Sequence, residues 1–365
     1  MKKFILFVVL LTISMAPQIA QPKQIIDDIF LVMAVGYDYV DEDRFTGTAV
    51  APFYKPDKTI ENLAFSNTSS LVYQNRDKLE AESSKPLING KLQVALFNRE
   101  LAEKTGIFRY IDNLQRDPNV GARVQLAVFE GSTEKILHEL KTDEPIGTYL
   151  SNLIEENTEF SNLPQTNLHT FEFAYFVKGM DPILPLLEKR DDRVKIKGVA
   201  LLNKEKMVDV VPQREFFYLR SMYENFKKGI FHIKLDNEEE AFLTNISSSR
   251  KFIIKQNKDG LPPNVTINLK VKGIIREYSG PYIPDDLIND IERQIEKDIE
   301  KKNKEMLTTF QELGIDPIGI GYQVRHHTRN NNNNNNNGEN QTDIYPNVDI
   351  KVKADVTILE RGVIK

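Results

Sequence analysis

Apolar and polar residues alternate with a period of two in the first clearly patterned part of the chain. Residues 29–40 are rich in β-branched and aromatic side chains, and residues 45–54 resume the pattern after the polar turn 41–44. Alternation of this kind is typical of strands that bury one face. The pattern therefore predicts a β-hairpin that packs on a core.

The next part of the chain mixes strand patterns with helix patterns. Asn98 is placed to cap a short helix that ends near Gly106, and Thr133 is placed to cap another. Apolar residues recur at helical spacing over 107–114 and again after Pro145. Strands are expected over 92–97, 124–129 and 169–177, and the proline-containing polar stretch 52–70 is expected to be a loop or a weak helix.

Short strands dominate the pattern of the second half. They are expected over 194–202, 207–211, 230–235, 252–255 and 265–275. Pro212 begins a predicted helix that turns Phe216, Leu219 and Phe226 inward and ends at Gly229. Because links of hairpin length dominate, the sheet is expected to be antiparallel or mixed.

The longest periodic segment runs from Pro284 to Gly314, with apolar residues three or four positions apart. It predicts a helix of about 30 residues, or ~45 Å at 1.5 Å per residue. Asn303 interrupts the apolar seam, so a helix lying across the second sheet is preferred over a coiled coil. The charged residues expected on its solvent face are Glu292, Glu296, Glu300, Lys297, Lys301 and Lys304.

The end of the chain combines a polar tract with a closing strand. Residues 330–337 are polyasparagine, which cannot bury apolar surface, and a disordered loop is therefore predicted over 328–343. Alternation over 348–358 then predicts a strand that ties the C-terminus into the sheet.

Prolines and a charged run indicate where the domains divide. Pro182, Pro185 and the charged residues 188–193 are interpreted as a linker. The predicted organisation is a signal or anchor segment over 1–20, an N-terminal domain over 21–190 that could hold two subdomains, and a C-terminal domain over 191–365. Both domains are predicted to be α+β, with mixed or antiparallel sheets and packed helices.

The start of the chain has the order of an export signal. Lys2 and Lys3 precede an apolar run of 13 residues, 4–16, which is shorter than the ~20 residues of a spanning helix. Small residues near Ala16 suit a signal peptidase, but Pro17 would hinder cleavage there, and Ala20 is a second candidate. A buried core element is the alternative, and the order of charge, apolar run and small residues favours export. No later segment approaches the length of a membrane-spanning helix.

Composition narrows the classes of function. The chain has 365 residues, enough for two domains, and a net charge of −5 without a basic stripe. A nucleic-acid partner is therefore not expected. The chain has no cysteine, which excludes disulfides, thiolate metal sites and cysteine nucleophiles.

The search for catalytic motifs is negative. The sequence has no GxxxxGK[ST] phosphate loop, no GxSxG nucleophile elbow and no HExxH zinc helix. His326 and His327 are adjacent, but on a strand they would point to opposite faces, so they are interpreted as exposed residues rather than metal ligands. The other histidines, His138, His169 and His232, are isolated. No catalytic, cofactor-binding or metal-binding residue is predicted, and the ligand-binding residues remain open.

Acidic pairs and one glycine-containing segment have structural explanations. Asp285-Asp286 suits the positive end of the long helix, Asp27-Asp28 suits a turn, and Asp191-Asp192 falls in the predicted linker. Glu238-Glu239-Glu240 is interpreted as a solvated loop. The segment 316–321 has two glycines spaced by one residue, but it is expected between a helix and a strand, the reverse of the order that binds phosphate. It is interpreted as a turn.

Several short motifs occur in an order that spans residues 25 to 362. They are Ile26-Asp27-Asp28-Ile29 through Val35-Gly36-Tyr37-Asp38, Leu92-Gln93-Val94 with Glu100-Leu101-Ala102 and Gly106-Ile107, Arg116-Asp117-Pro118, Gly198-Val199-Ala200-Leu201, Asp316-Pro317-Ile318-Gly319-Ile320-Gly321 and Arg361-Gly362. In this order, and with the long helix, the chain resembles the C subunit of nutrient germinant receptors in spore-forming bacteria, the GerAC-type spore germination proteins.

The resemblance implies a non-enzymatic receptor component at the outer face of the inner spore membrane. It would act with two integral-membrane partners, the A and B subunits, in the response to nutrients such as amino acids or nucleosides. Members of this family usually end the signal with a lipobox cysteine, and this chain has none, so thioether lipidation is impossible. The chain would reach the membrane through its apolar segment or its partners, or it would be released; translation from another start site is a further explanation.

Two other classes of function compete with this interpretation. An exported solute-binding protein would close two domains on a ligand, but such proteins are usually built from alternating strands and helices. An envelope hydrolase would need a carboxylate pair across a cleft, for which Asp27, Asp28, Asp191 and Asp192 are the candidates. The interpretation as a receptor subunit is preferred over both.

Overall fold

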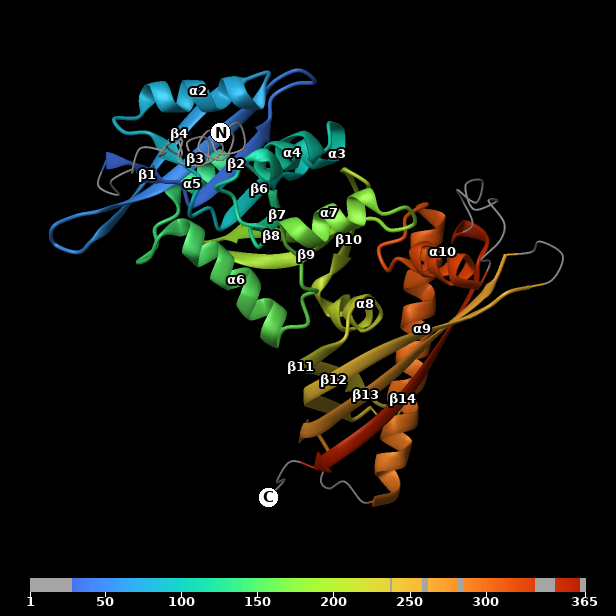
Figure 1. The fold of residues 1–365 in the computed structure, drawn as a ribbon. Helices are drawn as coiled ribbons and strands as arrows, with labels where there is room; N and C mark the ends of the chain where they lie inside the picture. The colour runs from blue at the N-terminus through green and yellow to red at the C-terminus, as the bar shows by residue number, and fades with distance from the viewer. Residues whose placement is uncertain (1–27, 237, 258–261, 281–284, 332–344, 362–365) are drawn as a thin grey trace, which may run out of the picture.

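The computed structural model describes residues 28–236, 238–257, 262–280, 285–331 and 345–361, which form two lobes, each built on a β-sheet (Figure 1). The predicted signal segment 1–20 and Asp27 lie outside the described residues. The first sheet has the order β10-β9-β8-β7-β6-β2-β3-β4 and the second has the order β11-β12-β13-β14. The α+β class and the two sheet-based units agree with the sequence-based prediction.

Parallel strands form the centre of the first sheet. The strands are β2 (Ala34–Tyr39), β3 (Phe45–Tyr54), β4 (Ile60–Ser69), β6 (Val94–Asn98), β7 (Gln125–Glu130), β8 (Ile183–Arg190), β9 (Arg193–Asn203) and β10 (Lys206–Pro212). Strands β2, β6, β7 and β8 run parallel, and antiparallel strands flank them on both sides. The first sheet is therefore mixed, and its parallel neighbours need crossover connections.

Helices supply those crossovers and cover both faces of the first sheet. They are α2 (Val72–Glu82), α3 (Arg99–Lys104), α4 (Phe108–Arg116), α5 (Thr133–Glu139), α6 (Ile146–Phe160) and α7 (Leu168–Phe176). Buried residues of α5 and α6 pack with one face, and those of α2, α3, α4 and α7 pack with the other. A short parallel pair, β1 (Phe30–Leu31) and β5 (Leu87–Ile88), lies apart from the main sheet.

Two segments of the first lobe have a different structure from the predicted one. The predicted loop or weak helix within 52–70 is largely the edge strand β4. Its Thr68 and Ser66 hydroxyls pair with those of Thr46 and Thr48 on β3, both at 2.9 Å. Polar residues suit such an edge. The predicted strand over 169–177 is helix α7, because Asn167 and Thr170 form a capping box that starts a helix in spite of the aromatic residues.

Smaller differences concern turns and helix ends. The predicted linker 188–193 is a tight hairpin between β8 and β9, in which Asp191 adopts a positive φ of 53°, so the first sheet continues to the end of β10. The helix predicted to be capped by Thr133 is capped by Ser132 instead. The helix predicted from Pro212 ends at Tyr223, and Phe226 already belongs to a strand.

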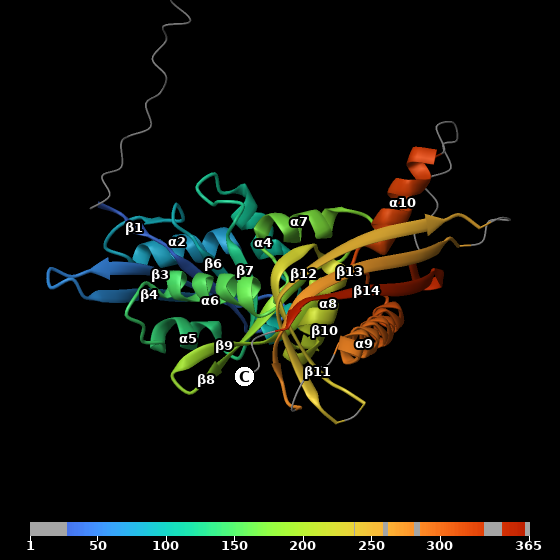
Figure 2. The ribbon, with the colours of Figure 1, turned by 90° about the horizontal axis from the view of Figure 1, so that it is seen from below.

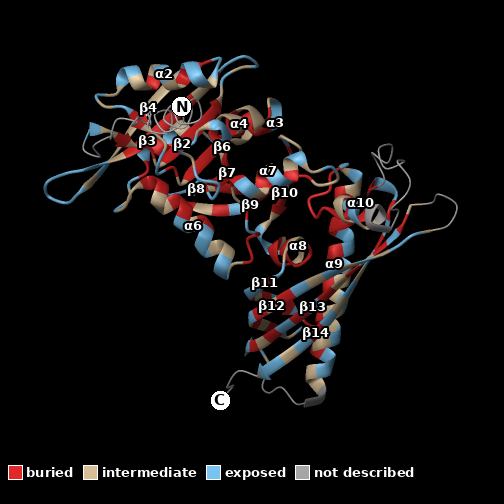
Figure 3. Ribbon diagram, viewed as in Figure 1, coloured by how far each residue is buried: buried red, intermediate tan, exposed pale blue. Residues whose placement is uncertain are grey.

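The second lobe packs its long helix on one face of its sheet. After η2 (Gln213–Glu215) and α8 (Phe216–Tyr223) come β11 (Phe226–Lys234), β12 (Glu240–Lys255), β13 (Asn264–Tyr278), α9 (Asp285–Glu312), α10 (Ile320–Asn331), η4 (Tyr345–Asn347) and β14 (Asp349–Arg361). Alternate residues of β13, such as Val265, Ile267 and Leu269, are buried (Figure 3), as are Ile291 and Ile295 of α9. The predicted long helix across the second sheet and the closing strand are confirmed.

Helix α10 lies where a turn, a strand and the start of a loop were predicted. It contains His326 and His327, so the prediction that these residues lie on a strand is wrong. Its last residues, 328–331, overlap the predicted disordered loop, and the rest of that loop lies outside the described residues. Within the described residues no helix has the length and apolar character needed to cross a membrane.

Three glutamates of α9 cover the free edge of strand β14. Glu292, Glu296 and Glu300 accept hydrogen bonds from the backbone N–H groups of Ile358, Val356 and Ala354, at 2.7, 3.0 and 3.0 Å. Residues four apart on a helix rise ~6 Å and residues two apart on a strand rise ~6.7 Å, so the two rows match. The prediction that these glutamates only face solvent is wrong, since they saturate an edge that could otherwise pair with another chain.

Replacing Glu292, Glu296 and Glu300 together by alanine should expose this edge. We expect the free energy of unfolding to fall by about 1–3 kcal/mol and the protein to self-associate at concentrations where the wild type does not. Chemical denaturation and sedimentation velocity measure the two effects. The matched control replaces Arg293, Lys297 and Lys301, exposed residues of the same helix, and should change neither measurement by a comparable amount. Equal behaviour of the two triple variants would show that the glutamate row does not protect the edge.

Candidate functional site

The carboxyl ends of the parallel strands are the first place to seek a site, because ligands of open α/β sheets bind there. At the end of β2, Asp38 is buried and accepts hydrogen bonds from Thr133 N, Thr133 Oγ1 and Glu134 N, each at 2.7 Å. Burial raises the pKa of the Asp38 carboxyl, while the hydrogen bonds from Thr133 and Glu134 lower it, and burial prevails. This carboxylate fills the N-terminus of α5, where a bound anion would otherwise sit.

Gly36 precedes Asp38 by two residues in the motif Val35-Gly36-Tyr37-Asp38 and lies where β2 meets α5. A Cβ at Gly36 would lie 2.5 Å from Thr133 Oγ1 and 2.8 Å from Leu137 Cδ1. The missing side chain therefore lets α5 approach the sheet closely enough for Asp38 to cap it. The motif is a structural joint between β2 and α5.

Asp316 plays the same part at the start of α10. Its Oδ1 accepts from Gly319 N at 2.8 Å and Ile320 N at 3.0 Å, and its Oδ2 accepts from Gly321 N at 2.6 Å. The segment 316–321 thus precedes a helix, contrary to the prediction, and that order alone would suit a phosphate. The Asp316 carboxylate occupies this position, so the segment caps a helix and is not a free anion site.

The same aspartate connects the two lobes. Asp181, between α7 and β8, accepts from Asp316 N at 2.9 Å through Oδ2, and its own N–H donates to Asp316 O at 3.0 Å. Its Oδ1 accepts from Lys204 N, in the β9–β10 turn, at 3.1 Å. Nearby, Tyr322 N donates to Gly179 O at 2.9 Å. We call this group, Gly179, Asp181, Lys204 and Asp316 with Tyr322, the interlobe joint.

Burial raises the pKa of Asp316 to about 7, against the three N–H donors, with Asp181 adding a smaller increase. The folded chain therefore binds this proton more tightly than the unfolded chain, whose carboxyl titrates near 3.8. Stability contributed at Asp316 should fall as the pH rises from about 4 to 7, by on the order of 1 kcal/mol per pH unit. Denaturation of the wild type and of Asp316→Asn across this range tests it: the wild type should lose stability relative to the variant. The assignment would be contradicted if the difference in unfolding free energy between the wild type and the variant stayed constant from pH 4 to 7. It would also be contradicted if the wild type gained stability relative to the variant as the pH rose.

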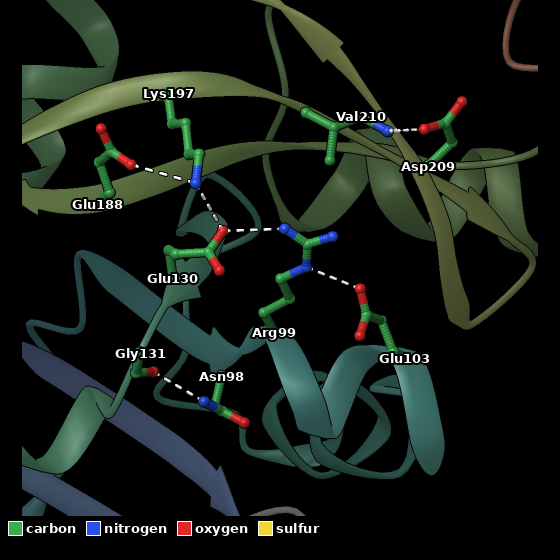
Figure 4. A network of polar contacts seen from close by, with 9 residues as sticks. All are labelled: Asn98, Arg99, Glu103, Glu130, Gly131, Glu188, Lys197, Asp209 and Val210. Atoms are coloured by element: carbon green, nitrogen blue, oxygen red, sulfur yellow. Dashed lines mark hydrogen bonds and ion pairs between the residues drawn. The ribbon is translucent and has the colours of Figure 1, made fainter.

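A network of ion pairs surrounds the ends of β6, β7 and β8 (Figure 4). Glu130 accepts from Arg99 at 3.0 Å and from Lys197 at 3.1 Å, Lys197 also contacts Glu188 at 3.2 Å, and Arg99 contacts Glu103 at 2.7 Å. Burial raises the pKa of Glu130, but the hydrogen bonds from Lys197 and Arg99 outweigh it and hold the pKa below its usual value. A carboxylate stabilised in its charged form is poorly suited to act as a general acid or base near neutral pH.

The structure does not bring the acidic pairs and histidines of the sequence together. Asp191 and Asp192 form the exposed β8–β9 turn, and Asp28 is exposed at the other end of the chain. His138 contacts Ser66 at 2.8 Å and His232 contacts Glu240 at 3.1 Å, on different lobes. Across the described ranges no group of three His, Asp or Glu residues is placed to hold a metal ion.

The remaining motifs also hold the fold together. In Arg116-Asp117-Pro118, Asp117 accepts from Asn89 at 3.0 Å and from Asn119 N at 2.9 Å. A Cβ at Gly198 would lie 2.8 Å from Val211 O, so this glycine allows β9 and β10 to pair closely.

A small pocket of about 50 Å³ lies under α2, lined by residues such as Tyr37, Asn75 and Arg76. It has room for a few waters and is too small for an amino acid or nucleoside.

Sequence reasoning missed the interlobe joint. Gly179, Asp181 and Lys204 belong to no sequence motif, because the residues that they contact are distant in the sequence. Lys204 lies 23 residues from Asp181, and Asp316 lies 135 residues from Asp181. Asp316 was singled out, and an Asp three residues before Gly319 at the start of an apolar run is a recognisable N-cap pattern. That signal would have predicted the helix that the structure shows.

Comparison with known proteins agrees with the order of the motifs. Residues 22–189 match the family described as the spore germination protein N-terminal domain, and residues 197–362 match the spore germination B3/GerAC-like C-terminal family. The spore germination protein GerQC of Bacillus cereus is 29% identical over 368 residues, covering 100% of this chain and 99% of the relative.

A solved structure has the same fold. The crystal structure of the GerBC protein matches with a TM-score of 0.53 at 15% identity, over 91% of this chain and 99% of the other. The two family models together cover both lobes. The chain therefore belongs to the GerAC family of spore germination proteins, the C subunits of germinant receptors.

Proposed function

We propose that this chain is a non-enzymatic subunit of a membrane-associated germinant receptor, which supports nutrient-triggered germination together with two integral-membrane partners, the A and B subunits. It would be exported and lie at the outer face of the inner spore membrane. The division into the segments 1–20, 21–190 and 191–365 belongs to the same proposal; the matched family regions, which divide between residues 189 and 197, support it, although β9 and β10 continue the first sheet. Family membership supports the role in germination, and the partners, the nutrient trigger and the location are inferred.

The interlobe joint is the observation that carries the proposed role as a docking subunit. Asp181 and Asp316 bond to each other's segments through two hydrogen bonds, and the buried apolar residues of α8 belong to one core cluster with both sheets. Two lobes that are joined in this way suit a subunit that helps to assemble a complex or that transmits a conformational change from one partner to the other. It does not suit a solute-binding protein, whose domains must open and close on a ligand.

A deletion strain tests the proposal. The gene is deleted in a strain that retains only the receptor to which this chain belongs, and germination is followed after addition of nutrients and after a trigger that bypasses nutrient receptors. We expect loss of the nutrient response, an unchanged response to the bypass trigger, and recovery with the wild-type gene. Normal nutrient germination without the gene, or turnover of a substrate by the purified protein, would overturn the proposal.

A further inference from the structure

The second sheet has one covered face and one open face. Helix α9 lies behind it in Figure 1 and below it in Figure 2, and α8 packs against α9 and the sheet. The alternation along β13 agrees: Val265, Ile267, Leu269 and Val271 are buried, while Lys270 and Lys272 are exposed. The residues that point away from α9 therefore form a surface of their own.

Lysines dominate the upper part of this surface, on strands β12, β13 and β14. We call it the open face and define it by its charged residues, which are Lys251, Lys255, Lys270, Lys272, Lys351, Lys353, Asp349 and Asp355, all exposed. The register aligns Lys251 with Asn268 and Asn268 with Lys353, and it places Lys270 and Lys272 on the strand between. Six lysines and two aspartates give a local charge of +4 in a chain whose net charge is −5.

The fold itself does not account for this clustering. Among the described residues, the ion pair that these lysines make is Lys351 with Asp349 at 4.0 Å, a weak contact. The register also sets Lys270 opposite Asp355, so four of the six lysines face neither aspartate. An uncompensated cationic surface on an otherwise acidic protein therefore points to an anionic partner.

An anionic bilayer is the occupant that the observations favour. The charged residues spread over three neighbouring strands of the sheet, β12, β13 and β14, and are not confined to one strand that would hold a single acidic segment. Helix α7, on the same side of the molecule as the open face in Figure 2, exposes Phe173 by 43% and Phe176 by 60%. Exposed aromatic rings on the same side of a protein as a group of lysines are typical of proteins that bind the interface of anionic membranes.

We propose that the open face binds the anionic headgroups of a bilayer and orients this subunit on the membrane. Each lysine near an anionic bilayer contributes about 1 kcal/mol, so six of them are enough for reversible attachment. The inference rests on the proposed function only in that a membrane lies beside the protein.

Vesicle binding by the purified full chain tests the inference without partner subunits. The probes are vesicles of phosphatidylcholine alone and of phosphatidylcholine with phosphatidylglycerol, at low and high salt. The test variant is K270E/K272E/K353E. The matched control is K297E/K301E/K302E on the outer side of α9, which changes the net charge by the same amount. All three proteins share the N-terminal apolar segment, so its contribution is equal in each.

The wild type and the α9 control should bind the anionic vesicles in a salt-dependent way, and the open-face variant should bind at least about tenfold more weakly. Equal loss in both variants would show that only net charge matters and would overturn the inference. So would equal binding to both kinds of vesicle, or preferential binding of polyglutamate, which would make an acidic protein the partner. The thermal unfolding of both variants is compared with that of the wild type, so that a loss of binding caused by unfolding can be recognised. If the open-face variant binds vesicles as well as the α9 control does, while the deletion strain no longer responds to nutrients, the inference is wrong and the proposed function is still supported.

Discussion

Replacing Gly179 by valine should destabilise the protein by about 3 kcal/mol or more and open the interlobe joint. Gly179 has a φ of +84°, and a Cβ there would lie 2.7 Å from Gly321 C and Tyr322 N. A β-branched residue at positive φ costs of order 1–3 kcal/mol, and overpacking against backbone adds a similar amount. The hydrogen bond from Tyr322 N to Gly179 O should be lost as well. Chemical denaturation measures the stability, and limited proteolysis between the lobes measures the opening.

Gly314 offers a matched control for this substitution. It also has a positive φ, +67°, but an added Cβ would meet no atom within 4 Å. Gly314→Val should therefore cost only the backbone strain and leave the proteolysis pattern unchanged. If the two variants were equally stable and equally resistant, the close approach at Gly179 would have no role in holding the lobes together.

The second large effect is expected at Gly36. Valine there would drive its methyl groups into Thr133 and Leu137, which a Cβ alone would already approach to 2.5 and 2.8 Å. Helix α5 would have to move away from β2, and the buried Asp38 would lose its three hydrogen bonds. We expect a loss of about 2–4 kcal/mol, from overpacking and from an unpaired buried carboxylate.

Gly121→Val is the control for that loss, because an added Cβ at Gly121 has no neighbour within 4 Å. It should remain within about 0.5 kcal/mol of the wild type, as surface substitutions usually do. In spores, Gly36→Val should reduce the amount of protein and the nutrient response together. A Gly36→Val protein that unfolds like the Gly121→Val protein would refute the close packing of α5 on β2.

Strong periodic signals predicted the elements that they cover. The apolar spacing of Ile291, Ile295 and Ile299 predicted α9 and the face by which it packs, because a helix of that length has few alternatives. The alternation in β13 and β14 predicted the strands for the same reason. The α+β class and the family followed from these elements and from the order of the motifs.

The errors arose where distant partners decide the structure. Helix α7 is rich in aromatic residues, which favour strands locally, yet the cap at Asn167 and the burial of Phe171 make it a helix. Glu296 looks like any solvent-facing residue until the edge of β14 is known to lie beside it. Asp181 and Asp316 are far apart in the chain, so no local pattern could show that they bond to each other's segments.

The sequence predicted least about the surface of the molecule, for a related reason. The motifs that carry the family resemblance proved to be joints: Asp38 and Asp316 cap helices, and Gly198 permits two strands to pair. The proposed docking role would need a defined shape more than reactive groups, and surface residues that serve it would carry no sequence motif. The lysines of the open face became visible only when the register of β12, β13 and β14 placed them side by side.

Fractionation of spores tests the central claim most directly. The chain is detected in the inner-membrane and soluble fractions of wild-type spores and of spores that lack the A or the B partner. We expect it in the inner-membrane fraction of the wild type, and a smaller amount there when either partner is absent. Recovery only as a free soluble protein, with the same distribution in every strain, would contradict a receptor subunit docked at the membrane.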